Sequence, residues 1–237
     1  MAGIWDCHCG HRFNLLITMI STKDSYLTLK TPGIGLFKDK GSKFIASVFP
    51  MEDEEQFERE LSDIREQHIK ARHFCTAFRL GPLSPMERFN DDGEPSGSAG
   101  RPILGQLHSA NLLRVGAVVV RYFGGTKLGV SGLIEAYRES TAAAIQDAKI
   151  IQKEVKETFC IECSYAQMPH IMEAFKFAQI DILQKEFSST PEFLIALPLS
   201  QVESSWNRIA THFVGHSASR NNLEKDHNMK INTLTIE

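Results

Sequence analysis

The sequence predicts an α+β protein built from two domains. Segments that alternate apolar and polar residues predict strands, and longer segments with apolar residues every three or four positions predict helices. Residues 149–157 are mostly charged and separate two such ordered patterns. We therefore expect an N-terminal domain at residues 24–152 and a C-terminal domain at residues 153–237. A chain of 237 residues, 42% of them apolar, has the length and the apolar material for both.

The first half of the N-terminal domain shows strand patterns around one long helix. We expect strands at residues 26–29, 43–48 and 72–78, and a break in regular structure at residues 32–35, where Pro32 and two glycines occur. Residues 51–71 predict an amphipathic helix, because Phe57, Leu61 and Ile64 recur on one face and acidic residues crowd its first turns.

The second half of this domain contains its most unusual residues. Residues 81–90 predict a loop, and residues 102–108 predict the start of a helix, with Ser98 as a possible cap. The strand expected at residues 115–122 is so apolar that it should be buried on both faces. Gly124 and Gly125 end it, and a second helix is expected at residues 133–147.

The C-terminal domain is predicted to have the order βαββαβ. Strands are expected at residues 158–165, 180–187, 193–197 and 229–236, with helices at 168–178 and 201–213. This order is that of a ferredoxin-like split βαβ unit. Cys160 and Cys163 form a CxxC sequence, but residues three apart on a strand point to opposite faces, so we interpret them as core or edge thiols.

The charge balance limits the classes of partner. The 26 basic and 29 acidic residues give a net charge of −3, which argues against a general polyanion-binding surface but allows a local basic patch. The longest apolar run near the N-terminus is too short to span a bilayer and lacks the features of a signal peptide. Five cysteines, an odd number, do not suggest a disulfide framework. We expect a cytoplasmic protein with no membrane partner.

Residues 1–23 contain a cluster of potential metal ligands, namely Cys7, His8, Cys9 and His11. A structural zinc site normally needs a second ligand pair a dozen or more residues away, and no such pair follows. We therefore interpret residues 1–23 as an N-terminal extension that is disordered or foreign to the native fold, while metal binding there stays an alternative.

An acidic loop follows the predicted loop of residues 81–90. Asp91, Asp92 and Glu94 are spaced so that their carboxylates could hold a divalent cation. The alternative is that these acids cap the next helix or pair with arginines, which would also relieve their mutual repulsion. The candidate arginines are Arg72, Arg101 and Arg121. We favour the alternative, and expect no cofactor other than this possible cation.

A glycine-rich turn lies between the buried strand and the second helix. The backbone N–H groups of Gly124, Gly125 and Gly129 could cradle an anion near Lys127, although the turn matches neither a Walker A sequence nor GxGxxG. A tight turn that simply requires glycine is the other interpretation. Between residues 101 and 138 there are five basic residues and one acid, with Tyr122 and Phe123 among them as a possible stacking surface for a base.

No catalytic residue is assigned. The chain has no nucleophile elbow and no HExxH, and His73 is more simply a structural histidine than a proton-transfer catalyst. We expect the acids, glycines and arginines to converge in one polar pocket. The candidate binding residues are Arg72, His73, Ser96, Gly97, Ser98, Gly100, Arg101, Arg121, Tyr122, Gly124, Gly125, Lys127 and Gly129.

Four segments resemble the YigZ/IMPACT family in its bacterial two-domain form. They are residues 40–46, 71–75, 91–104 and 118–129, and the resemblance covers about residues 24–237. It implies an N-terminal domain like the second domain of ribosomal protein S5, and a ferredoxin-like second domain. That pairing resembles neighbouring domains of a translational elongation factor, which suggests RNA or ribosome contact by analogy of fold.

Three hypotheses for function follow. The first is a non-enzymatic binding or regulatory protein that contacts RNA or the translation apparatus through a cleft of the N-terminal domain, between Asp91 and Arg138. The second is a nucleotide- or phosphate-binding enzyme that uses the glycine-rich and acidic loops. The third is a protein–protein regulator of a stress or translation pathway, as the resemblance to eukaryotic IMPACT proteins implies, although their partner domain is not found in this chain.

Overall fold

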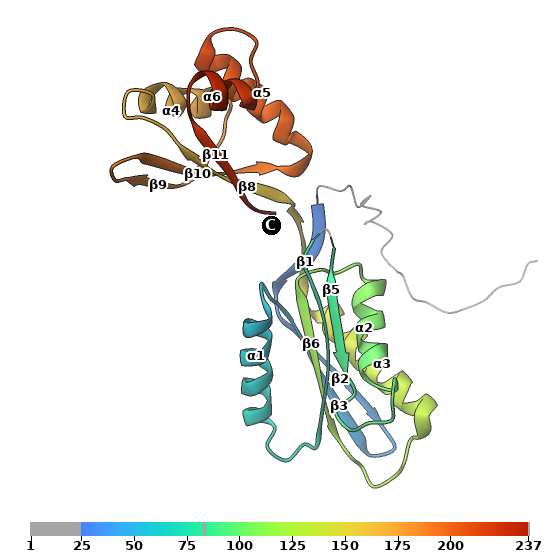
Figure 1. The fold of residues 1–237 in the computed structure, drawn as a ribbon. Coiled ribbons are helices and arrows are strands. Elements are labelled where there is room, and N and C mark those ends of the chain that lie inside the picture. The colour runs from blue at the N-terminus through green and yellow to red at the C-terminus, as the bar shows by residue number, and fades with distance from the viewer. Residues whose placement is uncertain (1–24, 83, 237) are drawn as a thin grey trace, which may run out of the picture.

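The computed structural model describes residues 25–82 and 84–236, and these form two parts with a sheet and helices each (Figure 1). The predictions for residues 1–23, including the cysteine and histidine cluster, lie outside the described residues. Among the described residues, no helix combines the length and the apolar character needed to cross a membrane.

The N-terminal part is built on a five-stranded antiparallel sheet in the order β2-β3-β6-β4-β5. Helix α1 (Glu54–Gln67) covers one face, and α2 (Gly100–Ser109) and α3 (Gly129–Asp147) cover the other (Figure 1). The strands are β2 (Gly33–Asp39), β3 (Ser42–Pro50), β4 (His73–Leu80), β5 (Met86–Asn90) and β6 (Val115–Tyr122).

Strand β6 lies at the centre of the sheet and is buried on both faces, as the sequence predicts. Val118 and Val120 pack in the cluster under α1, while Ala117 and Val119 pack in the cluster under α2 and α3. A helix layer on each side therefore explains why this strand is apolar at every one of these positions rather than at alternate ones.

The expected break at residues 32–35 is wrong, because residues 33–39 form β2 against β3. The glycines are needed for packing, since α3 crosses directly over this strand. A Cβ atom at Gly33 would lie 2.2 Å from the carbonyl oxygen of Ala144, and one at Gly35 would lie 2.2 Å from that of Ser140. Glycine here permits close contact between helix and strand instead of breaking the strand.

The expected loop at residues 81–90 is also wrong in its second half, where β5 pairs with β4 at the edge of the sheet. All five residues of β5 are exposed, so no apolar alternation marks it. Helix α1 is shorter than predicted: the side chain of Asp53 caps it by accepting from Gln56 N, and the helix ends before His68.

The charged segment at residues 149–157, which separates the two ordered patterns of the sequence, lies mostly in strands. Strand β7 (Lys149–Glu154) pairs with β1 (Ser25–Thr31) in a two-stranded ribbon, and β8 (Lys156–Glu162) continues into the second sheet. Most side chains of β7 are exposed, which accounts for their charge.

The C-terminal part has a four-stranded antiparallel sheet in the order β11-β8-β10-β9. The other strands are β9 (Ile182–Phe187), β10 (Pro191–Pro198) and β11 (Lys230–Ile236). Helices α4 (Met168–Phe177), α5 (Val202–Val214) and the unpredicted α6 (Arg220–Asp226) lie together on one face (Figure 1). Cys163 packs in the core under these helices, while Cys160 lies outside that core and both thiols are free, in agreement with the prediction.

Candidate functional site

The loop between β5 and α2 is organised by the carboxylate of Asp91. This carboxylate accepts hydrogen bonds from the backbone N–H groups of Gly97 at 2.7 Å, Ala99 at 3.0 Å and Gly100 at 2.8 Å. Asp91 thus binds the first turn of α2, where the helix dipole favours a negative charge. The prediction of Ser98 as the cap is wrong, because its hydroxyl instead donates to the carbonyl oxygen of Pro95 at 2.6 Å.

Asp92 fixes the same loop to strand β4. Its carboxylate accepts a hydrogen bond from the backbone N–H of Phe74 at 2.7 Å, and its carbonyl oxygen lies 2.8 Å from Nδ1 of His73. Asp92 and Gly93 both have positive φ angles, 42° and 83°, so the chain turns sharply here. The contact explains His73 as a structural residue that holds the loop to the sheet.

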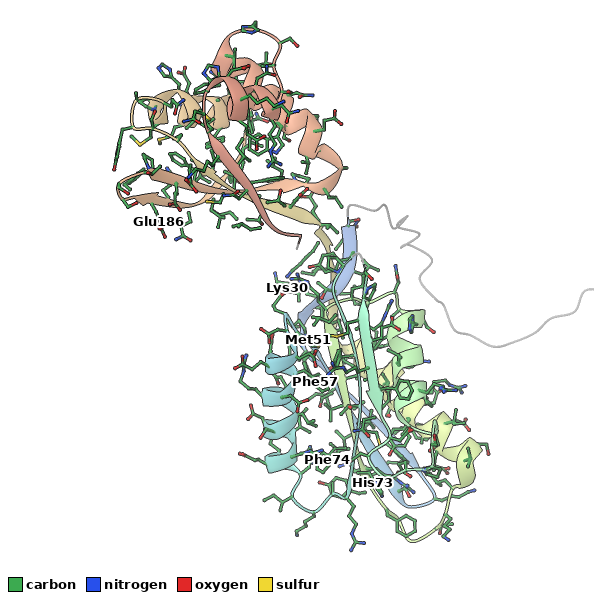
Figure 2. All side chains as sticks on the ribbon, viewed as in Figure 1. Lys30, Met51, Phe57, His73, Phe74 and Glu186 are labelled. Atoms are coloured by element: carbon green, nitrogen blue, oxygen red, sulfur yellow. The ribbon has the colours of Figure 1, made fainter. Side chains whose placement is uncertain are left out.

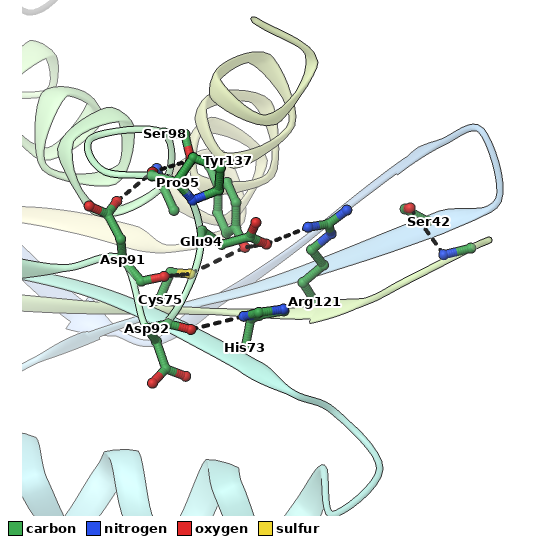
Figure 3. A network of polar contacts seen from close by, with 12 residues as sticks. Ser42, His73, Cys75, Asp91, Asp92, Glu94, Pro95, Ser98, Arg121 and Tyr137 are labelled. Atoms are coloured by element: carbon green, nitrogen blue, oxygen red, sulfur yellow. Dashed lines mark hydrogen bonds and ion pairs between the residues drawn. The ribbon is translucent and has the colours of Figure 1, made fainter. Parts of the chain in front are cut away.

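Glu94 and Arg121 form a buried ion pair inside the N-terminal part (Figure 3). The distance from Nη1 of Arg121 to Oε1 of Glu94 is 2.5 Å, and only 8% and 4% of the two side chains are exposed. The hydroxyl of Tyr137, on α3, donates to the same carboxylate oxygen at 2.8 Å. The thiol of Cys75, on β4, lies 3.2 Å from that hydroxyl. We call these four residues the Glu94 network.

Two rings complete the environment of Arg121. Its Cζ atom lies 5.5 Å from the centroid of Phe44 and 5.6 Å from that of Phe123, so its charge is held by cation–π contacts as well as by Glu94. Glu94 and Arg121 therefore lie in contact, while their convergence with the glycine-rich turn in one polar pocket stays a prediction. Arg121 and Glu94 pair with each other and both side chains are buried, so they offer little surface to a ligand.

The thiol and the phenol of the Glu94 network remain protonated at neutral pH. The pKa of Cys75 is raised to about 12, chiefly by burial; the Tyr137 hydrogen bond lowers it, and the nearby carboxylates of Glu94, Asp92 and Asp91 add to the rise. Burial, and next Cys75, raise the pKa of Tyr137 far above its ordinary value. A thiol in this state is a poor nucleophile, so the network is suited to structure rather than to covalent catalysis.

The geometry favours structural roles for the three loop acids. Asp91 and Asp92 accept backbone N–H groups, and Glu94 pairs with Arg121, as the alternative interpretation of these acids expects. Within residues 25–82 and 84–236, no group of three or more histidine, cysteine, aspartate or glutamate side chains is arranged to hold a metal ion. The divalent cation stays a prediction without a supporting contact.

The glycine-rich turn has two kinds of glycine. Gly124 is held against the hairpin of β2 and β3: its N–H donates to Oγ of Ser42 at 3.1 Å, and an added Cβ would lie 1.9 Å from the carbonyl carbon of Gly41. Gly125 and Gly129 have φ angles of 90° and 74° and face open space. Gly124 is therefore required by packing. Gly125 and Gly129 leave exposed backbone at the start of α3, where an anion could approach.

The remaining candidate residues lie at the surface. Arg72, Ser96, Arg101 and Lys127 are exposed, and Arg101 lies with its Cζ 5.9 Å from the ring centroid of Phe89. The hydroxyl of Tyr122 is 2.9 Å from Nδ1 of His68, at the end of α1. Tyr137 was missed by sequence reasoning, because an aromatic residue on a helix next to a sheet has the pattern of ordinary core.

Basic residues collect at one end of the N-terminal part. The hairpin between β2 and β3, the connection from α1 to β4, and the turn from β6 to α3 all lie at this end (Figure 1). Strand register brings them together, since Lys43 pairs with Tyr122 and His73 pairs with Arg121. We define the basic end as Lys38, Lys40, Lys43, Lys70, Arg72 and Lys127; none of them forms an ion pair with another described residue.

Residues 40–145 match the model of the Impact N-terminal domain, and this range contains the acidic loop, the Glu94 network and the glycine-rich turn. The chain is 32% identical to YvyE of Bacillus subtilis over 169 residues, which are 71% of this chain and 78% of that protein. The chain belongs to the IMPACT family.

Further comparisons place more of the chain within this family. YigZ of Escherichia coli, another IMPACT family member, is 30% identical over 181 residues, which are 76% of this chain and 89% of that protein. A crystal structure described as that of a hypothetical protein has a TM-score of 0.65 at 26% identity, covering 90% of this chain and 98% of the other. The two-part fold is therefore shared with a solved structure over nearly its whole length.

Proposed function

We propose that this IMPACT family member is a non-enzymatic regulatory protein that contacts RNA, such as the RNA of the translation apparatus, through the basic end of its N-terminal domain. The observation that carries the proposal is the collection of basic side chains there with no ion-pair partner among the described residues. Nucleic-acid backbones are bound chiefly by such cations, which release counterions from the phosphates.

Local acids cancel only part of this charge. Glu94 is neutralised by Arg121, which is not counted in the basic end, while Asp91 and Asp92 keep their negative charge and bind backbone N–H groups. Asp39, in the hairpin, is the remaining acid among the loops that carry the basic end. The excess of positive charge is therefore turned toward solvent, which favours an anionic partner.

An exposed aromatic ring accompanies the cations. Phe123 is 58% exposed at the end of β6, with the guanidinium of Arg121 over its ring. An exposed large aromatic among unpaired basic residues is the combination that single-stranded nucleic acids use, because bases stack on the ring while cations bind the backbone.

The folds of the two parts also bear on RNA contact. We infer a ferredoxin-like second domain, because the chain order of strands and helices and the sheet order β11-β8-β10-β9 both suit a split βαβ unit. We also infer that the N-terminal domain is like the second domain of ribosomal protein S5. This analogy of fold adds to the charge argument.

Two other functions compete with RNA binding. A nucleotide- or phosphate-binding enzyme would use the exposed backbone at Gly125 and Gly129 together with Lys127. A protein–protein regulator would use the basic end on an acidic partner. Thermal shift with a nucleotide panel and Mg²⁺ tests the first, because a ligand that binds the folded state raises its melting temperature.

Salt-dependent binding of a fluorescent single-stranded RNA tests the proposal directly. The variant is Lys38→Gln/Arg72→Gln/Lys127→Gln, which removes three exposed charges of the basic end. The control is Lys149→Gln/Lys176→Gln/Lys185→Gln, which removes three exposed and unpaired charges elsewhere. Arg121 is left intact because its loss would leave Glu94 buried without its cation.

The slope of log affinity against log salt should fall in magnitude by about 2 in the basic-end variant, since each phosphate contact on a single strand contributes about 0.7. The control should keep the wild-type slope. Equal slopes for the wild type and the basic-end variant, or an equal loss in the control, would contradict the proposal. A nucleotide-dependent thermal shift without RNA binding would support the enzyme instead.

A further inference from the structure

The sheet of the C-terminal domain has one face without a helix. Helices α4, α5 and α6 pack on the other face, over a core that includes Phe159, Ile161, Phe193 and Ile195. Cys160 and Glu162 of β8, and Glu192 and Leu194 of β10, alternate with these, so they point away from the helices and are partly exposed. Figure 2 shows Glu186, on β9, on the side of the sheet away from the helices. We call this side the open face.

Strand register aligns four charged residues in one row across the open face. Glu192 of β10 pairs directly with Glu162 of β8 on one side and with Glu186 of β9 on the other. Lys230 of β11 pairs with Glu162 and completes the row. Like charges placed directly opposite each other on neighbouring strands repel, so two adjacent pairs in this row are unfavourable in the isolated molecule.

The row has one cation for three carboxylates. Nζ of Lys230 lies 3.0 Å from Glu162 and is largely exposed. Glu186 accepts a hydrogen bond from the amide of Gln184 at 2.7 Å, and the thiol of Cys160 is 4.0 Å from Glu192. These contacts supply weak donors but no second positive charge. Burial and then Glu192, Glu162 and Glu186 raise the pKa of Cys160, in keeping with negative charge gathered at this point.

An apolar hollow lies beside the row of carboxylates. Cys160 pairs with Leu194, and both line a hollow of about 240 Å³ with Leu234, Gln184, Glu186 and Glu192. Leu234 is 54% exposed, and Leu194 is partly exposed. These two leucines in the lining give apolar surface that water contacts in the free protein.

We propose that the open face binds a basic protein segment, in which an apolar side chain fills the hollow and flanking lysine or arginine side chains pair with Glu186 and Glu192. The carboxylates of the row indicate which class of molecule the open face binds. An RNA or an anionic lipid surface would add negative charge to carboxylates that already repel one another, whereas a basic polypeptide would relieve that repulsion. This surface lies in the other domain from the basic end and is independent of RNA binding.

Three labelled nine-residue peptides test the proposal with the full chain, by fluorescence anisotropy. The first alternates lysine with leucine, the second replaces lysine with glutamate, and the third replaces leucine with serine. The test variant is Glu186→Gln/Glu192→Gln. The control is Glu173→Gln/Asp181→Asn, which removes two exposed negative charges elsewhere in the same domain.

The lysine–leucine peptide should bind, and its dissociation constant should rise at least tenfold in the Glu186→Gln/Glu192→Gln variant. It should change less than twofold in the control, and the other two peptides should bind at least tenfold more weakly to the wild type. Leu234→Ser, at an exposed position, should also weaken binding while the circular dichroism spectrum is unchanged. Bound peptide should slow the alkylation of Cys160, measured by mass spectrometry.

Four results would overturn the proposal. They are equal losses in the test and control variants, equal binding of the lysine–serine peptide, an unchanged rate of Cys160 alkylation, and slower Cys160 alkylation caused by a single-stranded RNA in the absence of peptide. Sedimentation gives a further decision: dimerisation that disappears in the Glu186→Gln/Glu192→Gln variant would show that a second copy of the chain occupies the face instead.

Discussion

Replacing Arg121 with methionine should destabilise the N-terminal domain strongly. Methionine has a similar length and suits a buried site, so the substitution removes the charge and its hydrogen bonds more than it removes volume. In the protein, Arg121 pairs with Glu94 and lies over Phe44 and Phe123, with 8% of its side chain exposed. After the change, Glu94 keeps only the hydrogen bond from Tyr137 at 2.8 Å.

The expected loss follows from this arrangement. Removal of one partner from a buried ion pair costs about 3–5 kcal/mol, because the other charge remains desolvated. The cation–π contacts with two rings contribute about 0.5–2 kcal/mol, part of which methionine replaces through contacts of its sulfur. We therefore expect a loss of about 4 kcal/mol in the free energy of unfolding, a large share of the 5–15 kcal/mol typical of a folded domain.

A double-mutant cycle isolates the pair. Arg121→Met, Glu94→Gln and the double variant are compared by urea unfolding, while hydrogen exchange followed by mass spectrometry reports β6 and α3 separately from β8 and β10. Each single variant should lose about 3–5 kcal/mol, and the double variant should lose at least about 1 kcal/mol less than their sum. Additive losses, or a loss below about 1 kcal/mol for Arg121→Met, would refute a buried and coupled pair.

Two further predictions concern helix packing and pH. Gly35→Ala should lower stability by about 1–3 kcal/mol in thermal unfolding, because the new Cβ would lie 2.2 Å from the carbonyl oxygen of Ser140. Alanine in place of glycine usually stabilises a strand. A gain in stability would therefore contradict the close packing of α3. Burial and then Lys43 lower the pKa of His68, so the folded state binds its proton less readily than the unfolded state does. The stability from His68 should be present above its ordinary pKa of 6.5 and fall as the pH drops through that value. Stability measured from pH 8 to pH 5 should show this fall, and His68→Gln should reduce it.

Much of the fold could be predicted from local patterns in the sequence. The all-apolar run of β6 predicted a strand covered on both faces, and helix layers on both sides of the sheet confirm it. Apart from α6, the order of strands and helices in the C-terminal part could also be predicted from the sequence pattern. Strands β2 and β5 could not be predicted from local patterns. The glycines Gly33 and Gly35 of β2 are required by the packing of α3, and β5 is fully exposed, so it has no apolar alternation.

Only part of the candidate site followed from the sequence. The acids and arginines could be recognised by type, and their capping and pairing roles could be stated as alternatives. The choice of partner could not, since Glu94 is 27 residues from Arg121 and 43 residues from Tyr137 along the chain. Nor could the row of Glu162, Glu192 and Glu186, which exists only through the register of three strands.

The sequence by itself determined the family, the two ordered patterns and the residue types available for polar contacts, because short-range periodicity and specific motifs are written in neighbouring residues. The tertiary structure decided which charged side chains form buried ion pairs and which stay exposed. Arg121 is neutralised inside the fold while the basic end stays exposed, and three glutamates stand side by side on the open face. The reason is physical: the effective strength of a charge depends on its burial and on its neighbours in space, and both are set by how distant segments pack.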